Sequence, residues 1–158
     1  MSTATTKLKS PRVVDGMAMQ IVGLSETYKK GKSDFSAQWK NFIPHFGKIP
    51  GQKSNVAYGV MFDDAGGLEY LAGVEVSGSS TPDGKFKQIT FPARKYAVFQ
   101  HYGPVSTIWK TLDAIHKDWL PASGHVPAEK PLFIERYGEK FDPVTASGDI
   151  EIWVPLKS

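Results

Sequence analysis

The sequence contains no cysteine among its 158 residues. This absence excludes disulfide bonds and thiolate metal sites, and it permits a reducing compartment. No hydrophobic run approaches the roughly 20 residues needed to span a membrane. The polar start MSTATTKLKS also lacks the apolar segment of a signal peptide. We therefore expect a cytoplasmic protein with no membrane association.

Charge and catalytic motifs are also sparse. The net charge of +3 comes from scattered basic residues, and the small cluster Lys29, Lys30 and Lys32 is typical of a solvated loop. The sequence has no basic helix or arginine-rich stripe, so direct DNA binding is not expected. Its four histidines form no metal-ligand spacing, and it has neither a G-x-S-x-G elbow nor a P-loop. We expect no metal and no cofactor.

Aromatic and apolar residues are plentiful by comparison. Hydrophobic residues make up 41% of the chain and aromatic residues 12%, which is sufficient for a single domain with a substantial core. Aromatic side chains mostly build cores, but they also line pockets for small molecules. The composition therefore leaves a binding role open.

An internal repeat organises the chain. The segment NFIPHFGKIPG from Asn41 aligns with DWLPASGHVPA from Asp118 at an offset of 77 residues, and YGVMFD from Tyr58 aligns with YGEKFD from Tyr137 at an offset of 79. Several matches in order favour a duplicated unit. We expect a disordered tail over 1–10 and one domain over 11–158, with repeats at about 11–76 and 86–158 and a linker at 77–85.

Each repeat shows the pattern strand, helix, strand, strand. In the first, apolar residues alternate over 11–28, a helix begins at Ser33 or Asp34 and ends at Pro44, and two strands form a hairpin across DAGG. In the second, Pro92 interrupts the first strand, a helix follows Pro104, and PLFIERYGEKF pairs with DIEIWVPL. The predicted class is α+β with tandem duplicated units, pseudo-twofold symmetry and a ligand groove between the halves.

Glu135 stands out because it lies in an otherwise apolar strand, FIERYG, and the repeat places Val56 at its counterpart. Strand residues alternate between faces. Ile150, Ile152 and Val154 suit a face packed on helices, so a hairpin would place Glu135 and Trp153 together on the face away from the helices. A register shift of one residue would instead put Glu135 in the helix-packed core.

Two interpretations of Glu135 remain open. It is either a solvated strand residue paired with Arg136, or a carboxylate at the base of an aromatic cleft between the two halves. In the second case an organic cation would keep it ionised through charge pairing and cation–π attraction. The residues expected to line such a cleft are Phe133, Tyr137, Trp153, Tyr58 and Tyr70.

Four segments together resemble the GyrI-like small-molecule-binding domain, the effector-binding domain of AraC-type and MerR-type regulators. They are YAVFQHYGPVSTI, the helix ending in DWLPASG, PLFIERYGEKFDP and IEIWVPL. The resemblance implies a tandem strand–helix–strand–strand fold whose groove binds hydrophobic, often cationic compounds. It places the family's pocket glutamate at Glu135, its following tyrosine at Tyr137 and the last-strand aromatic at Trp153.

The resemblance also implies three competing functions. Regulators of this family carry a DNA-binding module, for which this sequence leaves only about ten polar residues before the first strand. It therefore resembles stand-alone members, which bind or sequester compounds, hydrolyse reactive cyclopropane-bearing compounds, or inhibit gyrase. Binding a lipophilic cation is the first expectation, and hydrolysis with Glu135 as general acid or base is the second. A protein-interaction role with an unknown partner is the third.

Overall fold

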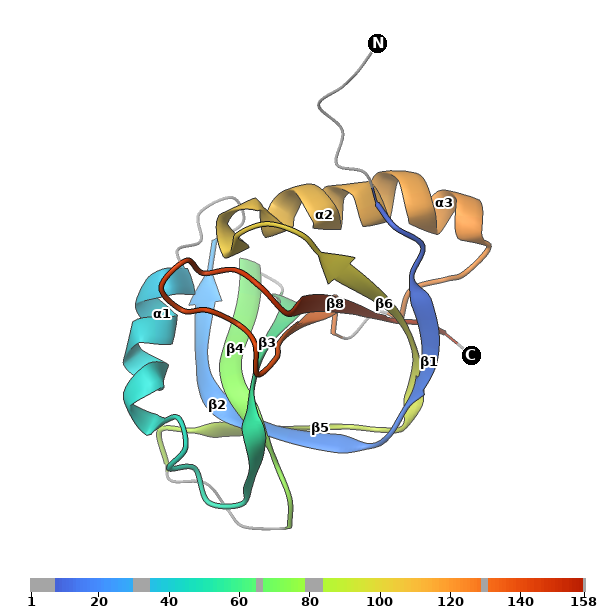
Figure 1. Cartoon of the computed structure of the whole chain (residues 1–158). Coiled ribbons are helices and arrows are strands. Elements are labelled where there is room, and N and C mark those ends of the chain that lie inside the picture. The colour runs from blue at the N-terminus through green and yellow to red at the C-terminus, as the bar shows by residue number, and fades with distance from the viewer. Residues whose placement is uncertain (1–7, 30–34, 65–66, 79–83, 129–130, 158) are drawn as a thin grey trace.

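The computed structural model describes residues 8–29, 35–64, 67–78, 84–128 and 131–157. Eight strands form one antiparallel sheet, which curls into a half-barrel (Figure 1). The strands are β1 (Arg12–Gly16), β2 (Met19–Tyr28), β3 (Gln52–Asp64), β4 (Gly67–Val76), β5 (Lys87–Phe91), β6 (Arg94–His101), β7 (Phe133–Tyr137) and β8 (Ile150–Pro155). No helix in the described ranges is long and apolar enough to cross a membrane.

A helix follows β2 in the first predicted unit and β6 in the second. Helix α1 (Phe35–Phe42) continues into a 3₁₀ turn over Ile43–His45, and its expected capping residues lie outside the described ranges. In the second unit, α2 (Ile108–Ala114), a π-helical turn (Ile115–Trp119) and α3 (Leu120–Ser123) form one continuous helical segment. It ends at Gly124, which has a φ of 78° that glycine adopts without strain.

The strand order β1-β6-β8-β7-β3-β4-β2-β5 has a simple pattern. It reads the same in reverse when each strand is exchanged for the strand four places away in sequence. This order agrees with two strand–helix–strand–strand units that meet where β3 pairs with β7. Duplication and symmetry themselves remain predictions.

The segment predicted as the first strand of each unit forms two separate strands, and these pair with different neighbours. Pro92 separates β5 from β6, as expected, and β5 pairs with β2 of the first unit while β6 pairs with β8. Likewise β1 pairs with β6 of the second unit, whereas β2 pairs with β4. The continuous or bent strand expected over 11–28 is therefore divided between the two halves.

The sheet has two differently covered faces. The outer face carries α1 and the α2–α3 segment (Figure 1) and holds the larger core, which includes Phe42, Tyr70, Phe99, Ile115 and Ile152. The inner face, on the other side, holds a smaller cluster of buried residues: Ile21, Val60, Leu71, Phe91, Tyr96, Val98 and Ile134. Burial of both faces explains why several strands read as continuous apolar runs.

The repeat alignment at an offset of 79 does not match these faces. It superposes Tyr58 on Tyr137, yet Tyr58 packs against the inner cluster and Tyr137 belongs to the outer core. Corresponding residues of two similar units should lie on the same face of the sheet, so this alignment does not match the two strands as they are placed.

Candidate functional site

The structure brings together four of the six predicted site residues. Phe133, Glu135 and Tyr137 alternate along β7 and all point to the outer face, where Tyr70 of β4 joins them. Tyr58 and Trp153 lie on the inner face instead. The predicted set is therefore divided between the two faces of one sheet.

The expected pairing of Glu135 with Trp153 on one face is wrong. In the hairpin of β7 and β8, Ile134 is opposite Trp153 and Glu135 is opposite Ile152. Directly opposed residues share a face, so Glu135 lies with Ile152 under the helices. This is the one-residue register alternative, and it places the carboxylate inside the main core.

Glu135 is held by two tyrosine hydroxyl groups. Its residue exposure is 5%, and its Oε1 accepts hydrogen bonds from Tyr70 Oη at 2.5 Å and from Tyr137 Oη at 2.8 Å. Trp39 of α1 donates from Nε1 to Tyr70 Oη at 3.1 Å. The tyrosine hydroxyl of Tyr70 thus relays a hydrogen bond from the indole to the carboxylate. The alternative of a solvated glutamate paired with Arg136 is wrong.

An aromatic layer from α1 covers this carboxylate. The Phe35 ring stacks on Tyr70 with centroids 4.2 Å apart and an interplanar angle of 23°. The Trp39 ring meets Tyr137 edge to face at 5.6 Å, and Phe141 meets Tyr137 at 5.0 Å. Such ring pairs add stability beyond the area they bury. Glu135 therefore lies beneath a closed set of aromatic rings.

Burial governs the ionisation of this cluster. Removal from water raises the pKa of Glu135, and the hydrogen bonds from Tyr70 and Tyr137 offset only part of that rise. Burial first, and then the nearby Glu135 charge, raise the pKa values of Tyr70 and Tyr137 well above the usual value. Both phenols therefore remain protonated donors at neutral pH. No lysine or arginine in the described ranges lies within ion-pair distance of Glu135.

Both predicted units contribute to the site. Glu135 and Tyr137 come from β7, while Tyr70 and Trp39 come from β4 and α1, and Glu135 is directly opposite Gly59 of β3. A Cβ atom at residue 59 would lie 2.0 Å from Tyr70 Oη and 2.6 Å from Glu135 Oε1. Glycine at this position therefore makes room for the hydrogen bond between the tyrosine and the glutamate.

Helix α1 supplies three residues of this site that were not among the predicted site residues, namely Phe35, Gln38 and Trp39. The amide of Gln38 is buried and donates to the backbone oxygens of Leu24 and Tyr70 at 2.9 and 2.7 Å. Tyr28 Oη donates to Gln38 Oε1 at 2.7 Å. The signal in the sequence was a polar residue on the apolar stripe of the helix, between Phe35 and Phe42.

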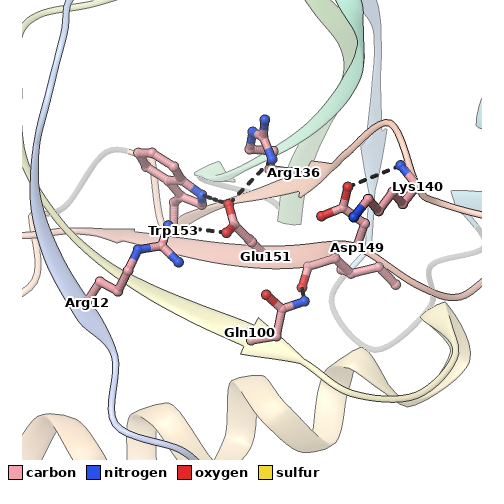
Figure 2. Close-up of polar contacts among 8 residues, drawn as sticks. Arg12, Gln100, Arg136, Lys140, Asp149, Glu151 and Trp153 are labelled. Carbon is pink, nitrogen blue, oxygen red and sulfur yellow. Dashed lines mark hydrogen bonds and ion pairs between the residues drawn. The ribbon is translucent and has the colours of Figure 1, made fainter.

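The other two predicted residues lie on the inner face, where Trp153 belongs to a polar cluster (Figure 2). Trp153 donates from Nε1 to Glu151 Oε1 at 3.0 Å. Tyr58 lies next to Arg136, which is its direct partner across β3 and β7. Burial raises the pKa of Tyr58, and the nearby Glu75 charge adds to that rise. Among the described residues, no group of acids and histidines could hold a metal ion.

A family model for the GyrI-like small molecule binding domain matches residues 9–157. The chain therefore belongs to the GyrI-like family, as the sequence resemblance indicated.

Known proteins similar to this chain include a transcription regulator and two solved structures. The transcriptional regulator BrlR of Pseudomonas aeruginosa is 31% identical over 150 residues, which are 92% of this chain and 54% of the regulator. The chain thus spans about half the length of that relative. The C-terminal domain of EcmrR has a TM-score of 0.74 at 16% identity, covering 97% of this chain and 99% of that one. SAV2435 bound to tetraphenylphosphonium has a TM-score of 0.69 at 21% identity, covering 95% of each chain.

Proposed function

We propose that this chain binds a small hydrophobic molecule with a positive charge, and that Glu135 pairs with that charge. The observation that carries the proposal is a fully enclosed carboxylate among aromatic rings, with tyrosine hydroxyl groups as its only hydrogen-bond partners in the described ranges. An organic cation would offset the cost of ionising Glu135 and would interact with the ring faces. A tetraphenylphosphonium-bound protein of the same fold supports this ligand class.

The ligand must replace part of the aromatic layer. Phe35 and Trp39 cover Tyr70 and Tyr137. A ligand therefore reaches Glu135 only when α1 moves away from the sheet. The hydrogen bond from Trp39 to Tyr70 would break in the same step. The site lies where β3 meets β7, which supports a ligand position between the two units. Among the predicted residues, Phe133, Tyr70 and Tyr137 would contact the ligand there.

Isothermal titration with methyltriphenylphosphonium and with neutral triphenylphosphine oxide tests the proposal. We expect the cation to bind more tightly than the neutral compound. Glu135→Gln should lower the affinity for the cation by about tenfold to a thousandfold and leave the affinity for the neutral compound unchanged. Cation affinity should also rise with pH, because ionised Glu135 is the form that pairs with charge. Equal binding of the two compounds, or no effect of the substitution, would contradict the proposal.

A hydrolytic role is the second candidate, and the raised pKa of Glu135 favours it. A protonated carboxyl in an apolar site is suited to act as a general acid toward a strained ring. Incubation with cyclopropane-bearing compounds and mass analysis of the products distinguishes the two roles. Turnover by the unmodified chain that is lost in Glu135→Gln would support hydrolysis, whereas recovery of unchanged compound would oppose it.

A further inference from the structure

We propose that the ligand of the Glu135 site is a flat bicyclic aromatic cation with an N–H donor beside its charge, and that it takes the place of the Trp39 indole. This inference rests on the proposed function, because it describes the ligand of the same site. It adds a requirement that charge alone does not impose, namely a hydrogen bond from the ligand to the hydroxyl oxygen of Tyr70.

The first observation is that the Trp39 indole already occupies space between the tyrosine rings of the site. Its ring meets Tyr137 edge to face at 5.6 Å and Tyr70 at 6.4 Å, with interplanar angles of 79° and 72°. Trp39 comes from α1, which lies on the outer face of the sheet (Figure 1), whereas both tyrosines belong to strands of the sheet. The indole therefore indicates the size of ring that the space over the tyrosines accepts when α1 moves away.

The second observation is the hydrogen bond made by the polar edge of this indole. Trp39 Nε1 donates to Tyr70 Oη at 3.1 Å, and Tyr70 Oη donates to Glu135 Oε1 at 2.5 Å. A phenol oxygen both donates and accepts, and Tyr70 is only 1% exposed, so water does not replace the indole donor. A ligand that displaces Trp39 without supplying a donor leaves this buried oxygen without a hydrogen bond, which lowers its affinity.

The other polar groups around the site are directed elsewhere. The hydroxyl of Tyr137 donates to Glu135 Oε1 at 2.8 Å. The amide nitrogen of Gln38 donates to the backbone oxygens of Leu24 and Tyr70, and Gln38 belongs to α1, so it moves with that helix. Within the described ranges, Trp39 is the one residue that donates to the Tyr70 hydroxyl. A ligand that displaces α1 must therefore supply the replacement donor itself.

The donor and the positive charge of the ligand must lie close together. Tyr70 Oη is 2.5 Å from Glu135 Oε1, so a group that donates to this hydroxyl also lies beside the carboxylate. An N–H group that carries part of a positive charge makes a stronger hydrogen bond than a neutral one. Aromatic nitrogen cations with an amino substituent combine a flat ring, a delocalised charge and such an N–H group. Sites that hydrogen-bond an N–H group discriminate against analogues that lack it.

The test compares 4-amino-1-methylquinolinium with 1,4-dimethylquinolinium by isothermal titration. Both are permanent cations with the same bicyclic ring, and they differ only in an amino group that replaces a methyl group. We expect the amino compound to bind about tenfold more tightly, the size of a hydrogen bond that involves a charged group. Tyr70→Phe keeps the ring and removes the acceptor, so it should abolish the difference between the two compounds.

Two further measurements test the displacement of Trp39 without relying on Tyr70→Phe. In ¹⁵N–¹H NMR spectra, the amino compound should shift the side-chain N–H signal of Trp39, assigned from Trp39→Phe. The signal of Trp119, assigned from Trp119→Phe, is the control and should stay in place, because that ring packs on Phe99 beneath the other helical segment. Trp39→Phe has no indole hydrogen bond to break, so it should bind both compounds more tightly and keep the ratio of their affinities.

Three results would overturn this inference: equal affinities of the two compounds, a preference that persists in Tyr70→Phe, or a Trp39 signal unchanged at saturation. Glu135→Gln reports separately on the proposed function and should weaken both compounds to a similar extent. Equal affinities that both fall in Glu135→Gln would overturn the requirement for a donor and retain cation binding. No binding of either compound would overturn both proposals.

Discussion

Glu135 shows how a single residue is balanced between burial and hydrogen bonding. Its carboxylate loses contact with water, which disfavours the ionised form, and gains two tyrosine donors, which favour it. The net direction is a raised pKa. An acid in this state gains from any cation that reaches it, and it lowers the stability of the empty protein when it ionises.

The pH dependence of stability should reveal this cost. Burial raises the folded-state pKa of Glu135 above that of an ordinary glutamate, so the folded chain binds more protons than the unfolded chain between the two pKa values. Unfolding free energy due to Glu135 therefore falls as pH rises through that window, and stays lowered above it. In urea titrations from pH 4 to 8, Glu135→Gln should gain stability relative to the unmodified protein as pH rises. A difference independent of pH would contradict this prediction.

Gly59 offers a steric test of the same site. The methyl group in Gly59→Ala would collide with Tyr70 Oη and Glu135 Oε1, so the hydrogen bond between them must break or shift. We expect a loss of about 1–3 kcal/mol in unfolding free energy, typical of overpacking, and loss of cation binding. Urea denaturation and calorimetry measure both. Gly84→Ala is the control, because no atom lies within 4 Å of a Cβ there.

At the scale of elements, α1 is fastened to the sheet by polar contacts as well as apolar ones. Gln38 connects it to β2 and β4 through Leu24, Tyr28 and Tyr70. The aromatic residues on either side, Phe35 and Trp39, cover the Glu135 site. The stability of this helix on the sheet thus controls access to the carboxylate.

Substitution of Gln38 should weaken the packing of α1 on the sheet. Gln38→Ala leaves two backbone oxygens and the Tyr28 hydroxyl without their side-chain partner, which costs about 1–3 kcal/mol. Protease cleavage within α1 should accelerate, and denaturant midpoints should fall. Lys40→Ala changes an exposed residue of the same helix and should leave both measurements unchanged. Equal cleavage rates in the two variants would show that Gln38 does not hold the helix.

At the scale of the whole molecule, the sheet depends on strands exchanged between its halves. Strands β1 and β5 leave their own units to pair with β6 and β2, and they form the two ends of the sheet. Each has only one neighbour and five residues. The strands at the centre, β7, β3 and β4, have partners on both sides.

Hydrogen exchange should follow this arrangement. Amide groups of β3, β4 and β7 should exchange most slowly, because their bonds break only on global opening, whereas β1 and β5 should exchange first. Mass spectrometry of peptides after timed exposure to deuterated water measures the order. Equal protection of all strands, from the edge strand β1 across the sheet to the edge strand β5, would contradict this order.

The sequence predicted most elements because their signals are local. Proline marked the break between β5 and β6. Alternation along β7 correctly grouped Phe133, Glu135 and Tyr137 on one face. These properties follow from backbone geometry and residue spacing, which the sequence contains in full.

Pairing between distant segments was not predictable in the same way. The choice between Ile152 and Trp153 as neighbours of Glu135 differs by one residue, and both alternatives place apolar side chains opposite one another. Because both faces of this sheet are buried, the hydrophobic pattern did not decide the register. The placement of Tyr58 and Trp153 away from Glu135 followed from that register alone.

By itself, the sequence determined the class of fold, the order of its elements and the presence of an acid within an apolar strand. Only the tertiary structure decided which face that acid occupies, and that Tyr70, Tyr137 and Trp39 surround it. The reason is physical: local conformation depends on neighbouring residues, whereas the surroundings of a carboxylate depend on strand pairings and helix packing that join residues far apart in the chain.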